Sequence, residues 1–141
     1  MSKNFEDELM ELQSDMISLC LELTKEQADY IFVYCSNEKN AKFFNAFFAI
    51  GGKLTKLHEL NVPDSIQWRF LDLGMEDLCK LDAIGKKHNM RVPTEMKMGY
   101  QVASGEFKAM YEYEPVCVGD VSSTDVYRSW VEQVRKGFRL N

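Results

Sequence analysis

The chain has 141 residues, 45% of them hydrophobic and 12% aromatic, which predicts one globular domain over residues 1–141. Its 17 basic and 22 acidic residues give a net charge of −5, which argues against a nucleic-acid binder that relies on phosphate neutralisation. Acidic residues stand near the start where a signal peptide would carry basic ones, and no apolar run is long enough to span a membrane. We therefore expect a cytoplasmic protein with no membrane partner.

The four cysteines are widely spaced, without a C-x-x-C pair and without a nearby histidine. This spacing is not typical of a zinc site, so we predict no metal and no cofactor. Cys20 and Cys79 lie in stretches with apolar periodicity, and we expect both to be reduced thiols in the core.

The first periodic stretch begins at Phe5, and its apolar residues recur at steps of three and four through Leu23. This spacing predicts an amphipathic helix with its leucine and methionine stripe in the core. Asn4 is the expected N-cap, and the three acids that follow Phe5 suit the positive end of the helix dipole.

Three strands are expected next. Residues 28–35 are β-branched and aromatic, and the turn-forming residues 36–40 follow them. Residues 41–50 carry phenylalanines on both faces, which is typical of an interior strand covered on two sides. Residues 53–60, which include His58, read as a more polar edge strand that lysines protect from unwanted pairing.

A second helix is predicted to begin with a capping box formed by Asp64 and Gln67. Its expected apolar side is broad and comprises Ile66, Trp68, Phe70, Leu71, Leu73, Leu78 and Leu81. Gly74 interrupts this pattern and marks a bend, a close backbone approach or a tolerated weak point. The basic run before Asn89 indicates the end of the helix, with Asn89 as its C-cap.

Residues 94–114 alternate in the two-residue period of a β-hairpin, and we expect the rest of the chain to be arranged around it. Gly105 can supply the positive φ of the turn at residues 103–106. One face is predicted to carry Met96, Met98, Tyr100 and Val102 from the first strand, and Phe107, Ala109, Tyr111 and Tyr113 from the second.

After a loop at residues 115–122, Ser123 or Thr124 is expected to cap a final helix with Trp130 buried on the sheet. Val126, Val134 and Phe138 continue its apolar stripe, which Tyr127 and Val131 widen. The predicted fold is therefore α+β, with helices packed on an antiparallel sheet of about five strands in the order α-β-β-β-α-β-β-α.

No catalytic motif is present: the chain lacks G-x-S-x-G, H-E-x-x-H, a P-loop and G-x-G-x-x-G. A cysteine with His58 or His88 is neither supported nor excluded as a nucleophilic pair. Glu112 and Glu114 stand two apart and are expected to share a strand face. They could form an acid/base pair, but the solvated face of a hairpin is the favoured interpretation.

The segment TEMKMGYQVASGEFKAMYEYEP, an acidic loop and then VYRSWVEQVRKGF resemble the hairpin and terminal helix of the YezG/EsaG-like antitoxin family. The residues that carry the likeness are Thr94, Gly105, Phe107, Tyr111, Glu112, Tyr113, Glu114, Tyr127 and Trp130. The resemblance implies an immunity protein that neutralises a nuclease toxin by binding and is not an enzyme. On this hypothesis, acids mimic phosphate charge toward the toxin, and the expected contacts are Glu112, Glu114, Asp120 and Asp125.

Alternatives remain open at this point. Asp72, Glu76 and Asp77 on the second helix could make the same contacts with a toxin. A small enzyme or ligand-binding domain would instead use Tyr100, Tyr111 or His58 in a pocket between sheet and helices. A third hypothesis is a self-associating structural protein. The sequence leaves open whether the protein is a monomer or a dimer.

Overall fold

The computed structural model describes residues 3–38 and 41–137, and it confirms the predicted α+β fold and element order. In chain order the elements are α1 (Phe5–Leu23), β1 (Tyr30–Glu38), β2 (Ala41–Ile50), β3 (Lys53–Lys56), the 3-10 helix η1 (Leu57–Glu59), α2 (Asp64–His88), β4 (Glu95–Gln101), β5 (Glu106–Glu112) and α3 (Ser123–Gly137).

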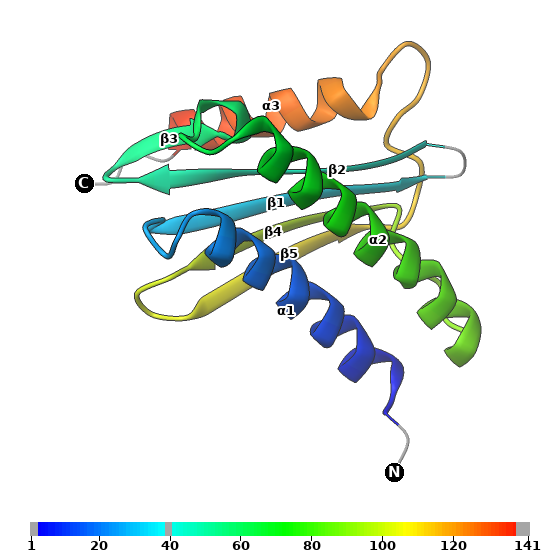
Figure 1. Cartoon of the computed structure of the whole chain (residues 1–141). Helices are drawn as coiled ribbons and strands as arrows, with labels where there is room; N and C mark the ends of the chain where they lie inside the picture. The colour runs from blue at the N-terminus through cyan, green and yellow to red at the C-terminus, as the bar shows by residue number, and fades with distance from the viewer. Residues whose placement is uncertain (1–2, 39–40, 138–141) are drawn as a thin grey trace.

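The five strands form one antiparallel sheet in the order β3-β2-β1-β4-β5. Helices α1 and α2 cross one face of this sheet, and α3 lies against the other, so the domain has three layers (Figure 1). The β4–β5 hairpin is therefore not the centre of the fold. The central strand is β1, which pairs with β2 on one side and β4 on the other, and β5 is an edge strand.

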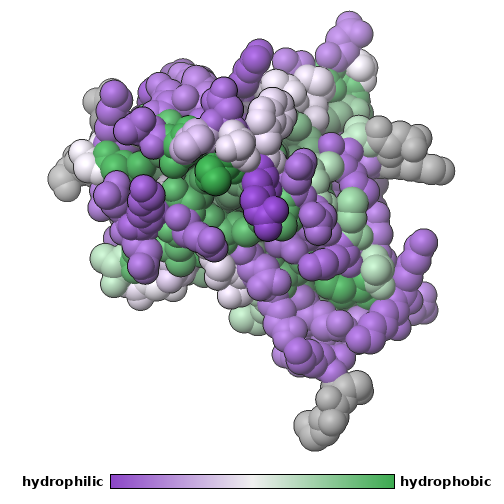
Figure 2. Space-filling model, in the orientation of Figure 1, coloured by the Kyte–Doolittle hydropathy of each residue, from purple (hydrophilic) through white to green (hydrophobic). Residues whose placement is uncertain are grey.

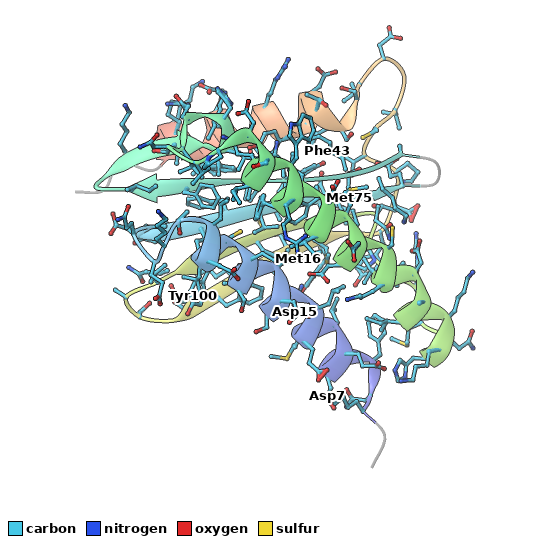
Figure 3. All side chains as sticks on the ribbon, in the orientation of Figure 1. Asp7, Asp15, Met16, Phe43, Met75 and Tyr100 are labelled. Atoms are coloured by element: carbon cyan, nitrogen blue, oxygen red, sulfur yellow. The ribbon has the colours of Figure 1, made fainter. Side chains whose placement is uncertain are left out.

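The larger core lies between the sheet and the α1–α2 layer. The predicted stripe of α1 faces it, with Met16 and Cys20 fully buried, and Figure 3 shows Met16 over the sheet between α1 and α2. Asn4 caps α1 as predicted, because its side chain accepts a hydrogen bond from the Asp7 N–H at 2.8 Å. On the outer surface of this layer, hydrophilic residues dominate around the N-terminal half of α1, and hydrophobic residues show between the helices (Figure 2).

The smaller core lies under α3. The ring of Trp130 packs edge-on against Phe47 with centroids 5.1 Å apart, and Tyr127 donates a hydrogen bond to the Ala46 carbonyl at 3.1 Å. Phe47 belongs to this core and Phe48 to the other one. The prediction that β2 is an interior strand with aromatic residues on both faces is confirmed.

Two strand boundaries differ from the predictions. β1 continues through Ser36, Asn37 and Glu38, where a turn was expected, because the Asn37 N–H finds a ladder partner in the Thr94 carbonyl at 2.7 Å. Lys39 and Asn40 lie outside the described residues. β3 ends at Lys56, and His58 lies in η1 and not in a strand; β3 is nevertheless an edge strand, as predicted.

Helix α2 has its predicted C-cap but not its predicted capping box. Asn89 adopts the left-handed conformation, whereas Gln67 donates to the Val62 carbonyl and no side-chain N-cap bond forms. The apolar side is narrower than expected, because Ile66 and Trp68 are exposed. Cys79 is also exposed, so its placement in the core was wrong.

Gly74 of α2 marks a close approach, which was one of its three interpretations. A Cβ atom at this position would lie 2.1 Å from the ring of Phe44, so no side chain fits without displacement of that ring. Glycine is therefore what allows α2 to sit directly on β2.

At the C-terminal end, α3 is capped one residue earlier than expected. Ser122 and Asp125 exchange hydrogen bonds, since the Asp125 N–H donates to the Ser122 hydroxyl and the Ser122 N–H donates to the Asp125 carboxylate. Trp130 is buried as predicted. Phe138, expected in the same stripe, lies outside the described residues.

Candidate functional site

Acidic side chains gather at one end of the sheet. In the ladder, Glu112 at the end of β5 stands opposite Glu95 at the start of β4, and Glu95 stands opposite Ser36 near the end of β1. Glu38 closes β1 at the same end. With Glu114 and Asp120 of the following loop and Asp125 at the start of α3, these acids are called the acidic end below.

The loop that follows β5 is fastened to this end by its backbone. A carboxylate oxygen of Glu38 accepts hydrogen bonds from the N–H groups of Val116 and Cys117 at 3.0 and 2.9 Å. The Thr94 hydroxyl donates to the Glu114 carbonyl at 2.7 Å. The loop therefore runs across the end of the sheet toward α3, and Figure 1 shows it reaching from β5 to the start of α3.

The four acids predicted as contacts have different environments. Glu112 and Asp120 are exposed, and in residues 3–38 and 41–137 neither side chain has an ion-pair or hydrogen-bond partner. Glu114 pairs with Arg91 at 2.5 Å. The prediction that it shares a strand face with Glu112 was wrong, because β5 ends at Glu112.

Asp125 has a structural role as the acidic partner of the α3 capping box. Hydrogen bonds from the backbone N–H and the hydroxyl of Ser122 lower the pKa of its carboxyl. Of the four predicted residues, Glu112 and Asp120 are thus the two whose charges face solvent without a partner in the described chain.

Sequence reasoning missed the buried part of the acidic end. Glu95 is only 4% exposed, and the Tyr34 hydroxyl donates to its carboxylate at 2.7 Å. The Lys97 amine approaches the same carboxylate at 3.8 Å. The position of Glu95 at the start of the first hairpin strand was a signal that this acid could be buried and bonded. Its partner could not be predicted, because Tyr34 lies on β1, far away in the sequence.

Cys117 adjoins this cluster and is not activated by it. Burial and then the neighbouring Glu38 carboxylate raise the pKa of the Cys117 thiol, which disfavours the thiolate that a nucleophile requires. Neither histidine takes part: His58 lies in η1 at the opposite sheet edge, and His88 pairs with Glu8 of α1.

The pocket expected by the rival interpretation has a counterpart in a shallow groove of about 270 Å³ between α1 and the β4–β5 hairpin. Figure 3 shows Tyr100 at this hairpin, below the C-terminal half of α1. Beside the groove, Gln13 donates to the Tyr111 hydroxyl at 2.7 Å. The other lining residues are mostly apolar or small: Met10, Ser14, Ile17, Ser18, Leu21 and Phe107.

Within the described residues no group of three or more His, Cys, Asp or Glu side chains is arranged to hold a metal ion. In the same part of the chain no helix combines the length and apolarity needed to cross a membrane. In comparisons with known proteins, no family model and no curated protein matches this chain.

Proposed function

We propose that this protein is an immunity protein, or antitoxin, that binds a cognate toxin and neutralises it by protein–protein inhibition. The toxin is a nuclease whose basic surface meets the acidic end. The observation that carries the proposal is the pair of exposed carboxylates, Glu112 and Asp120, whose charges have no partner in the described chain. The resemblance to the YezG/EsaG-like antitoxins supports the same class of function.

The acidic end is suited to a basic protein surface in two ways. Its exposed carboxylates attract Arg and Lys side chains, which mostly accelerates encounter. The backbone beneath them is fixed by the Glu38 and Thr94 hydrogen bonds, so little ordering is needed when a partner docks. Binding by this surface needs no catalytic residue.

The test is capture of the toxin encoded beside this gene, with the protein as bait and nuclease activity as the readout. We expect stoichiometric capture and loss of nuclease activity. A Glu112→Lys/Asp120→Lys variant should associate at least tenfold more slowly at low salt, because like charges then meet the basic toxin. A neighbour without toxicity, or a bait that captures no nuclease, overturns the proposal.

A matched control is available on α2. Asp72→Lys/Glu76→Lys makes the same change of charge at two exposed acids on another surface. If toxin binds through the acidic end, this variant keeps most of its association rate. If the α2 variant slows binding as much as the first, the toxin contacts α2 or responds only to net charge. Circular dichroism of both variants checks that the fold is kept.

The groove beside α1 favours a second candidate, a small enzyme or ligand-binding domain. Its apolar walls and the Gln13–Tyr111 hydrogen bond resemble the mixture of apolar surface and oriented polar groups found in small-molecule sites. A ligand screen that monitors the thermal midpoint separates the candidates. A hit whose stabilisation is lost in Met10→Asp favours this function over toxin binding.

A further inference from the structure

The outer strand of the β4–β5 hairpin is an unprotected sheet edge. Six of the seven residues of β5 are exposed, including Phe107, Met110 and Tyr111. The other edge strand, β3, has four residues, and two of them are lysines, which disfavour pairing with a further strand. A long exposed edge with apolar side chains on both faces is a template for pairing with another strand.

The hydrogen-bond pattern shows which residues of β5 face that edge. The Val102 N–H donates to the Asp29 carbonyl and the Asn37 N–H to the Thr94 carbonyl, so even-numbered residues of β4 bond to β1. Odd-numbered residues of β4 must then bond to even-numbered residues of β5. The backbone groups of Ala109 and Tyr111 therefore point outward and are available to a further strand.

Two copies of β5 related by a two-fold axis would pair antiparallel, and outward-facing residues must oppose one another. This condition is met by every register centred on a residue. A centre at Lys108 would place two lysines face to face, and a centre at Phe107 would run into the turn before β5, so the centres left to compare are Ala109, Met110 and Tyr111. With Ala109 at the centre, Glu106 would face Glu112 of the second copy and repel it. With Tyr111 at the centre, Met110 would face Glu112, and the pairing would run into the loop after β5.

The register centred on Met110 is self-complementary. Lys108 of each copy then faces Glu112 of the other, which forms the same ion pair twice. On the same face Met110 meets its own symmetry mate. On the opposite face, Phe107 meets Tyr113 and the small Ala109 leaves room for Tyr111 of the other copy.

The residues that follow Glu112 are held beside the sheet, where they can contact a second copy. The Thr94 hydroxyl donates to the carbonyls of Glu112 and Glu114, and the Arg91 guanidinium lies 5.7 Å from the centre of the Tyr113 ring. Tyr113 is thus kept alongside the sheet, where its ring can meet Phe107 in the Met110-centred register, while its carbonyl accepts a hydrogen bond from the Arg91 guanidinium.

From this geometry we infer that a second copy of the chain pairs with β5 through the Met110-centred register, which joins the two sheets into one. The inference does not rest on the proposed toxin binding. Because Glu112 belongs to both surfaces, the second copy and the toxin would compete for its carboxylate. Self-pairing is therefore measured on the isolated protein, without toxin.

The experiment is a concentration series in analytical ultracentrifugation at low salt. The weight-average mass should rise from the 16.4 kDa of one chain toward twice that value. Lys108→Glu and Glu112→Lys should each raise the dissociation constant about tenfold, because two attractive pairs become repulsive. The double variant Lys108→Glu/Glu112→Lys restores both pairs in this register and should return to near the wild-type constant.

Two further variants complete the test. Met110→Lys places two like charges at the axis and should abolish the dimer at concentrations where the wild type is paired. Lys53→Glu makes the same charge change as Lys108→Glu on the exposed surface of β3 and should leave the mass unchanged. A wild-type mass of one chain at every concentration overturns the inference, and so does a double charge swap that fails to restore pairing.

Discussion

The two long hairpins of this protein are similar in composition and opposite in environment. In β1 and β2, both faces of the sheet are covered, and Tyr34, Phe47 and Phe48 are completely buried. In the β4–β5 hairpin, β4 buries Met96 and Met98, whereas the aromatic side chains of β5 remain exposed. The difference follows from lateral position: β1 and β2 have a strand on each side, and β5 has one on a single side.

The comparison teaches that alternation in a strand indicates which residues share a face but not whether that face is covered. Tyr111 and Phe107 lie on the same face as Met96 and Tyr100, their register partners in β4. Yet α1 covers the β4 residues and leaves those of β5 at the margin. This exposed aromatic row belongs to the edge on which we infer that a second copy of the chain pairs.

The largest expected effect comes from truncating one aromatic side chain in each hairpin. Phe47→Ala should lower the free energy of unfolding by about 3–5 kcal/mol, because it leaves a cavity under α3 beside Trp130. Phe107→Ala removes a ring that is 38% exposed and should cost below about 1 kcal/mol. Urea denaturation at low protein concentration measures both; equal losses would mean that β5 is covered in solution.

The cost in stability of replacing a glycine should also differ between the two hairpins, and Gly74 of α2, which packs on β2, can be compared with Gly99 in β4. Gly74→Ala drives a methyl group into the Phe44 ring and should destabilise the protein by about 1–3 kcal/mol despite the better helix propensity of alanine. For Gly99→Ala in β4, the one neighbour of the new methyl group among the described residues is Phe32 at 3.9 Å, and the change should be neutral or slightly stabilising.

Phe44→Leu is the matched background for this test, because a smaller side chain leaves room for the methyl group. Gly74→Ala should cost less in that background than in the wild type, as thermal or urea denaturation of the four proteins of the cycle would measure. A cost that is identical in both backgrounds would refute the contact as its cause.

The smallest effect concerns the cap of α3, the helix that covers β2. Asp125→Ala removes the carboxylate that accepts the Ser122 N–H, and Trp130 fluorescence should report looser packing of α3, with β5 unaffected. The folded-state pKa of Asp125 is lowered by its hydrogen bonds from Ser122. Its stabilisation is therefore present above the unfolded pKa, about 3.9, and is lost as pH falls through the folded value.

The check is the difference in thermal midpoint between wild type and Asp125→Ala as a function of pH. This difference should be largest near neutrality and should shrink as the pH falls below about 4, where the carboxyl of the unfolded chain is also protonated. A difference that is constant down to the lowest measurable pH would mean that the carboxylate charge does not stabilise the cap.

Much of the fold was determined by local sequence. The stripe of α1 with its Asn4 cap, the two-faced aromatic pattern of β2 and the positive φ of Gly105 each follow from spacing or from the chemistry of one residue. The element order could be predicted for the same reason, since every helix and strand carries its own period.

Part of the candidate site could also be predicted, because the exposed acids Glu112 and Asp120 stand in a hairpin end and a loop. Their neighbours could not. Glu95 became a buried acid only because the sheet order places β4 beside β1 and thus beside Tyr34. Asp125 was predicted as a contact, but its bond to Ser122 gives it a structural role at the helix start.

Tertiary structure alone decided which periodic residues are covered. Trp68 and Trp130 both lie on apolar helix stripes, yet Trp68 is 67% exposed and Trp130 is 6% exposed. The sheet ends at the short strand β3 on one side and at β5 on the other. Periodicity records the face that a residue shares with its sequence neighbours, whereas burial depends on segments far away in the chain, and only the assembled sheet specifies those.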